Sequence, residues 1–173
     1  MSGKEVFLLD SNAFMTPFRF YYAFDLVPAY WKELRKHIES GSIVMLDAVK
    51  DEIEKGRDDL SDWISKIEDW VLVPKVTEQT VKEYQRVMQF VAHSGYYRNT
   101  ALTAWSPANV ADPWLIASAK TNGFTLVTEE TRSGGLSKKN PNRFAKIPDV
   151  ARNMGVDTIN VYEMMRRLRI CIL

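Results

Sequence analysis

The sequence contains very little cysteine: Cys171 stands alone among 173 residues. A single cysteine excludes an internal disulfide and a zinc site built on several cysteines. No apolar run approaches the ~18 residues of a membrane-spanning helix. The N-terminal MSGKEV also lacks the apolar stretch and cleavage site of a signal peptide. We therefore expect a cytoplasmic protein with no membrane association.

The composition is that of a water-soluble globular protein, with 46% hydrophobic and 26% charged residues. The length fits a single domain over residues 1–173. The net charge of +1 hides an asymmetry, because residues 131–173 carry nine Lys/Arg and three Asp/Glu (+6), against 14 and 19 (−5) in the rest. This basic segment suits a polyanion that is cut with the help of a metal, and it equally suits a solvated surface.

Short apolar runs alternate with helical patterns along the chain, which predicts an α/β fold with a mostly parallel sheet. The expected strands are 6–9, 43–46, 71–73, 125–128 and 156–161. The expected helices are 47–56, 62–70, 77–94, 112–122, 147–154 and 162–169. A polar loop is expected around 106–107, and a flexible loop over 131–146.

Acidic residues follow several of the expected strands. Asp10 comes directly after the first strand, and ligands of open parallel sheets bind beyond the carboxyl ends of the strands. The other acids near strand ends or helix starts are Glu52, Asp112, Glu129 and Glu130. If these strands are neighbours, their acids converge on one edge of the sheet.

Several carboxylates packed together repel one another unless cations neutralise them. Hard oxygen ligands of this kind suit Mg2+ or Mn2+. Such a cation, or a pair ~4 Å apart, activates water and binds the phosphate. Phosphodiester hydrolysis is therefore the chemistry that the acids favour.

Four pieces, in order along nearly the whole chain, resemble the PIN-domain family of metal-dependent nucleases. They are LLDSN at 8–12, the helix that carries Glu52, ADPWLIASAKTNGFTLVT at 111–128, and Glu130. The third piece is the most characteristic, because an Asp opens an apolar helix that is followed by glycine and by a strand ending in Thr-x-acid. The resemblance implies a three-layer PIN-like fold with helices on both faces of a mostly parallel central sheet.

The resemblance also implies roles for individual residues. Asp10, Glu52 and Asp112 match the metal-binding acids of the family, and Glu130 matches the fourth acid, which is usually Asp. Whether Glu129 takes the fourth position instead stays open at this point. Thr128 matches the catalytic hydroxyl that holds a metal-bound water or an acid, and Asn12, which we expect to bind substrate, resembles the polar residue two places after the first Asp.

Implied with these residues is a Mg2+-dependent endoribonuclease that leaves 5′-phosphate and 3′-hydroxyl ends. The family includes the toxins of bacterial toxin–antitoxin pairs, so a protein antitoxin and a homodimer are expected partners besides RNA. The sequence departs from small PIN toxins in its length, in the aromatic stretch 18–24 and in the loop 131–146. It therefore resembles a divergent, longer subfamily.

Two surface features have competing interpretations. The basic loop residues Arg132, Lys138 and Lys139 would bind substrate phosphates if the loop lies near the acids, or else form a solvated loop. The aromatic stretch 18–24 is more typical of a core or a protein interface than of a surface that stacks unpaired bases.

Other functions also fit part of the pattern. Haloacid-dehalogenase-like phosphatases place an Asp after the first strand, but they need a second Asp at the position that Asn12 occupies here. A non-catalytic binding module that retains the PIN shape is the other alternative. Taken singly, each acid also has a simple explanation: Asp10 as a turn residue, Asp112 as a helix cap and Glu52 as a solvated side chain.

Overall fold

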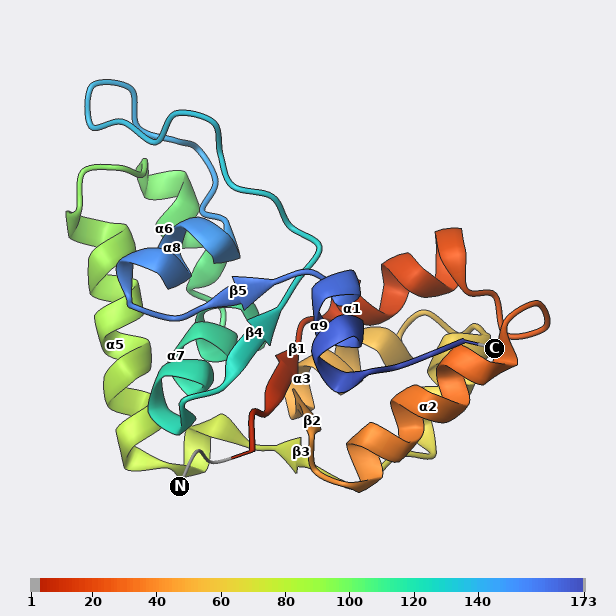
Figure 1. Cartoon of the computed structure of the whole chain (residues 1–173). Coiled ribbons are helices and arrows are strands. Elements are labelled where there is room, and N and C mark those ends of the chain that lie inside the picture. Colours follow the sequence, from red (N-terminus) through yellow and green to blue (C-terminus); the bar gives the residue numbers. More distant parts are fainter. Residues whose placement is uncertain (1–3, 173) are drawn as a thin grey trace.

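The structure is a computed structural model that describes residues 4–172. Its centre is a five-stranded sheet in the order β3-β2-β1-β4-β5, and every neighbouring pair of strands is parallel (Figure 1). The strands are β1 (Phe7–Leu9), β2 (Ile43–Leu46), β3 (Val71–Leu72), β4 (Thr125–Val127) and β5 (Thr158–Ile159). The predicted parallel α/β sheet is confirmed.

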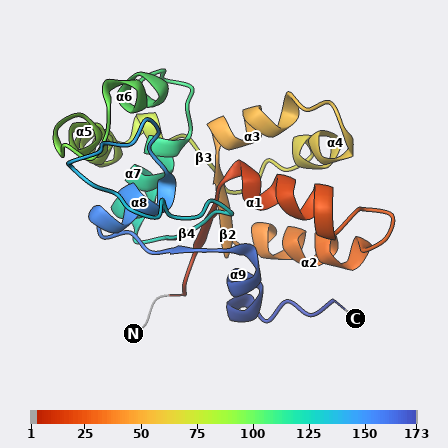
Figure 2. The same ribbon diagram turned by 90° about the horizontal axis from the view of Figure 1, so that it is seen from above.

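Helices cover both faces of this sheet (Figure 2). One layer contains α5 (Glu78–His93), α6 (Asn99–Trp105), α7 (Asp112–Asn122) and α8 (Ile147–Asn153). The other contains α1 (Ser11–Thr16), α2 (Pro28–Glu39), α3 (Asp47–Glu54), α4 (Asp59–Ser65) and α9 (Val161–Leu168). Two short helices complete the fold: a π-helix, η1 (Pro17–Tyr21), and a 3-10 helix, η2 (Pro74–Val76). The expected three-layer arrangement is therefore present.

The three central strands are buried on both faces, which explains their continuous apolar sequences. Every residue of β1, β2 and β4 is buried, whereas the edge strands β3 and β5 are two residues long and half-buried. Helix α7 is buried from Pro113 through Ala119 and packs between the sheet and α5. It ends at Gly123, whose φ of 69° is the left-handed conformation that glycine adopts most readily.

Some element boundaries differ from the sequence-based expectation. Helix α6 was not predicted, α4 begins and ends earlier than 62–70, and β5 covers only two of the six residues expected as a strand. The loop over 131–146 has no helix or strand, as expected, but it is tied to the preceding chain. Residue Asn142 bonds through its backbone to Tyr96 and Arg98, and the Arg143 carbonyl accepts from Thr100.

Strand β1 lies at the centre of the sheet, and the chain adds its later strands on both sides of β1. From β1 the chain builds β2 and β3 on one side, and it then returns to build β4 and β5 on the other. Ligands of doubly wound sheets bind at such a switch point, beyond the carboxyl ends of the strands. Over residues 4–172, the structure has no helix with the length and apolar character to cross a membrane.

Candidate functional site

Asp10 lies at the switch point between β1 and β4. The register pairs Leu9 with Val127, and the Asp10 backbone N–H donates to the Val127 carbonyl at 3.0 Å. The carboxylate is buried, and each of its oxygens accepts a hydrogen bond: Oδ1 from the Ser11 N–H at 2.7 Å and Oδ2 from the Thr128 hydroxyl at 3.0 Å. Asp10 is therefore held in one orientation by both strands.

Thr128 and Asn12 form a bracket beside this carboxylate. The Asn12 Oδ1 accepts from the Glu129 backbone N–H at 2.8 Å, and its Nδ2 lies 3.3 Å from the Thr128 hydroxyl oxygen. The same hydroxyl oxygen accepts from the Glu130 backbone N–H at 3.2 Å. Thr128 thus holds an acid, as the resemblance implies. Asn12, expected to bind substrate, has its amide engaged in fixing the end of β4.

Asp112 is the first residue of α7, one position after the cap residue Ala111. Burial, followed by the charges of Glu130 and Glu52, raises the pKa of its carboxyl group to about 6. Hydrogen bonding to its own backbone and to the side chain of Trp105 lowers the pKa in part. Asp112 is thus a half-buried acid that experiences two other acids.

The Asp10 carboxyl is perturbed in the same direction. Burial, and then the charge of Asp112, raises its pKa to about 7, with a smaller contribution from Glu130. The hydrogen bonds from Thr128 and Ser11 oppose this rise. Since Asp112 interacts with each of the other three acids, the four predicted carboxylates belong to one electrostatic cluster.

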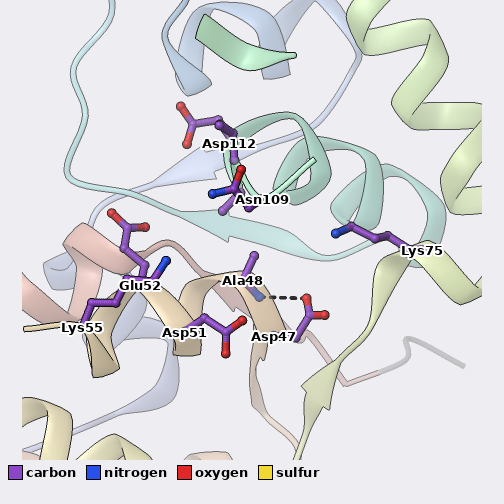
Figure 3. Close-up of a pocket in the computed structure, with 10 residues that line it drawn as sticks. Asp47, Ala48, Asp51, Glu52, Lys55, Lys75, Asn109 and Asp112 are labelled. Atoms are coloured by element: carbon purple, nitrogen blue, oxygen red, sulfur yellow. Dashed lines mark hydrogen bonds between the residues drawn. The ribbon is translucent and has the colours of Figure 1, made fainter. Parts of the chain in front are cut away.

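Glu52 reaches the cluster from α3, across a cleft of about 340 Å³ (Figure 3). Its exposed side chain extends toward the end of α7 that carries Asp112. The cleft is lined by Asp47, Ala48, Asp51, Glu52, Lys55, Lys75, Asn109, Val110, Ala111 and Asp112. Of these residues, the sequence predicts only Glu52 and Asp112 as site residues.

The two neighbouring glutamates after β4 point to different helices. The Glu129 Oε1 accepts from the Val161 N–H at the start of α9, and the Glu130 Oε2 accepts from the Ile147 N–H at the start of α8, both at 2.8 Å. Acids are favourable at helix N-termini. Of these two glutamates, only Glu130 contributes to the raised pKa values of Asp10 and Asp112, which favours Glu130 as the fourth acid.

The donor set fits a hard divalent cation, because it offers only carboxylate oxygens on elements that meet at one edge of the sheet. Burying such acids destabilises their ionised forms and so raises their pKa, and a bound cation would offset this destabilisation. In the part of the chain that the structure describes, no three His, Cys, Asp or Glu side chains converge closely enough to form a metal-binding group. One oxygen of Glu130, Oε2, accepts from the Ile147 N–H.

The predicted basic residues are distributed around the loop after β4. Arg132 lines the surface beside Glu130 and a larger cleft with Arg152. The Lys138 ammonium lies over the ring of Tyr96, 5.4 Å from its centre. Lys138 and Lys139 do not line the cleft of Glu52 and Asp112.

The aromatic stretch 18–24 divides into two parts. Phe18 and Phe24 pack on Trp31, with ring centres at 6.4 and 4.3 Å, as expected of a core. Phe20 and Tyr21, at the end of η1, are 73% and 52% exposed. The sequence does not distinguish these parts, because their separation depends on the π-helical turn.

Among the site residues that the sequence did not predict are Trp105, Lys55 and Lys75. Trp105 comes from the unpredicted helix α6 and contacts Asp112. Lys75 had a usable signal, because it follows the third expected strand and obeys the same strand-end rule as Asp10.

Comparison with known proteins adds a family. A search of curated proteins finds no match. The sequence model of a family described as "Domain of unknown function (DUF4411)" matches residues 7–172, which include every acid of the cluster. The chain therefore belongs to the DUF4411 family.

Proposed function

We propose that this protein is a Mg2+-dependent endoribonuclease of the PIN type, acting in the cytoplasm. One observation carries the proposal: Asp10, Asp112, Glu130 and Glu52 form a single electrostatic cluster at the switch point of a parallel sheet. Two of these acids have strongly raised pKa values, which is typical of functional sites.

In this proposal the four acids hold Mg2+ or Mn2+, which supplies water activation and charge neutralisation at the phosphate when bound. The protein's own contribution is positional. Thr128 and the Ser11 N–H fix the Asp10 carboxylate, and Asn12 fixes the backbone that carries Glu129 and Glu130. An orientation that is held in advance costs no reorganisation during the reaction.

The biological role rests on the resemblance to PIN toxins. It extends the proposal to the toxin of a toxin–antitoxin pair, with a protein antitoxin and a homodimer as partners. Expression of the protein alone should then arrest growth, and Asp112→Asn should relieve the arrest. Normal growth during expression of an active nuclease would count against the toxin role and leave the enzymatic proposal in place.

The direct test is cleavage of single-stranded RNA with Mg2+ and with a chelator. The wild-type protein should cut only with Mg2+ and leave 5′-phosphate ends, and Asp112→Asn should lower the rate at least ~10³-fold. Asp51→Asn is a matched control, because Asp51 is an exposed acid of the same cleft outside the cluster. Full activity of Asp112→Asn would refute the proposal.

A second candidate, a non-catalytic binding module, is favoured by one observation. Glu130 uses a carboxylate oxygen to bond the start of α8, and the described acids do not converge into a ready metal group. Such a module would bind RNA or a protein without cutting RNA. If the protein binds RNA but does not cleave it when Mg2+ is added, at any pH at which the protein is folded, the binding module is favoured over the nuclease.

A further inference from the structure

Each parallel strand delivers a polar residue to the carboxyl edge of the sheet, and for β3 that residue is a lysine. Asp10 follows β1, Asp47 follows β2 and Thr128 follows β4. Lys75 lies in η2, three residues after the end of β3, and lines the same cleft as Glu52 and Asp112. In Figure 3 its ammonium group points into the cleft, on the opposite side of the acids from Lys55.

The position of Lys75 is supported by aromatic packing. Its Nζ lies 5.9 Å from the centre of the Trp114 ring, and Trp114 is stacked on Tyr84 with ring centres 3.9 Å apart. Trp114 comes two residues after Asp112 on α7, so the same helix carries an acid of the cleft and the ring that lies near the lysine. A cation held over an aromatic face keeps its hydrogen-bond donors available.

Neither cleft lysine is paired with an acid of the described residues. Within residues 4–172, Lys55 and Lys75 form no ion pair within 4.0 Å, although four carboxylates line the same cleft. Lysines that served only to balance these acids would be expected to contact them. Their three N–H donors each are therefore free for an anionic ligand.

The charge of the cleft indicates when such a ligand would bind. Asp47, Asp51, Glu52 and Asp112 against Lys55 and Lys75 give a net charge of −2 when all are ionised. A divalent cation bound by the acids would offset this negative charge. The ammonium groups on either side would then attract phosphates against a weaker opposing field.

We propose that Lys75 and Lys55 bind the RNA phosphates on the two sides of the one that is cut, so that the cleft between α3 and α7 is the path of the substrate strand. This assignment rests on the proposed nuclease function and names its substrate contacts. Lysine binds phosphate as a point charge, without base readout. The two contacts therefore provide affinity and position the strand, but they do not select a sequence.

The test measures binding of a labelled single-stranded RNA to the wild-type protein with Ca2+ in place of Mg2+, so that a hard divalent cation is present without Mg2+-dependent cleavage, by fluorescence anisotropy over a range of salt concentrations. Lys75→Gln and Lys55→Gln should each weaken binding roughly fivefold and reduce the slope of log K against log [salt] by about 0.7. Lys82→Gln is the control, because Lys82 is an exposed lysine on α5, paired with Glu78 and outside the cleft. It should leave both values unchanged.

The outcomes separate the two proposals. If the double variant Lys55→Gln/Lys75→Gln binds with the affinity and salt slope of its parent, the lysine assignment is wrong. Cleavage of RNA by the wild-type protein with Mg2+ is measured in parallel. If the wild-type protein does not cleave, the nuclease proposal is overturned instead. Thermal unfolding of each variant confirms folding, which is expected because neither lysine is part of the core.

Discussion

Replacing Asp10 by Asn should stabilise the metal-free protein at alkaline pH. Folding raises the Asp10 pKa from 3.8 to about 7, chiefly through burial. A raised pKa means that the folded state favours the protonated acid. The protonated Asp10 carboxyl therefore makes its full contribution to the free energy of unfolding below pH 3.8, and this contribution is lost as the pH rises through about 7.

The magnitude follows from the two pKa values. Between pH 5 and pH 8, linkage predicts that Asp10 alone lowers the free energy of unfolding by roughly 2.5 kcal/mol. Asn does not ionise, and its carbonyl oxygen can still accept the bond from the Ser11 N–H. Between pH 5 and pH 8, the free energy of unfolding of the variant should therefore fall by about 2.5 kcal/mol less than that of the wild type. At pH 8 the variant should be the more stable protein.

Urea unfolding with a chelator, at pH 5 and at pH 8, measures this difference. Asp157→Asn, which removes an exposed acid outside the cluster, should follow the wild type. Saturating Mg2+ at pH 8 should raise the wild-type value, by about 2.7 kcal/mol at a hundredfold excess over Kd, and should raise that of Asp10→Asn far less. An Asp10→Asn protein with the wild-type pH dependence would refute the reasoning.

Three further predictions concern the residues around this carboxylate. Thr128→Val removes a donor from Asp10, so the Asp10 pKa should rise further and urea unfolding should show a loss of about 1–3 kcal/mol. Asn12→Ala removes the acceptor of the partly buried Glu129 N–H, and should cost about 1–2 kcal/mol in the same assay, with slower RNA cleavage. Glu130→Gln should weaken Mg2+ binding in calorimetry at least about tenfold, whereas Glu129→Gln should change it less than about twofold; the reverse order would make Glu129 the fourth acid.

The sequence predicted Asp10 at the carboxyl end of the first strand, whereas the role of Thr128 in holding a water or an acid came from the resemblance. Each follows a short apolar run, and the strand-end rule requires only that the two runs be parallel neighbours. Asp112 does not follow a strand, but its place at the start of a helix is predicted locally, because that helix is bounded by Pro113 and Gly123, both of which have local conformational preferences. These features are encoded within a few residues of sequence.

Other parts of the site depend on tertiary packing, which no local pattern encodes. Helix α6, with the sequence NTALTAW, has two threonines and no capping side chain, yet it packs Ala101 and Trp105 into the core. The choice between Glu129 and Glu130 depends on which helix start each side chain meets. Lys75 gains its position from a Trp114 ring 39 residues away in the chain.

The central claim is that the fold gathers these acids to bind a divalent cation, and calorimetric titration tests it most directly. Mg2+ or Mn2+ added to the wild-type protein near pH 7 should give saturable heat that varies with the buffer, because the cation displaces a proton held by the acids. Asp112→Asn should abolish this heat, and Asp51→Asn should preserve it. Absence of binding heat with the folded wild-type protein, for both cations, would contradict the account.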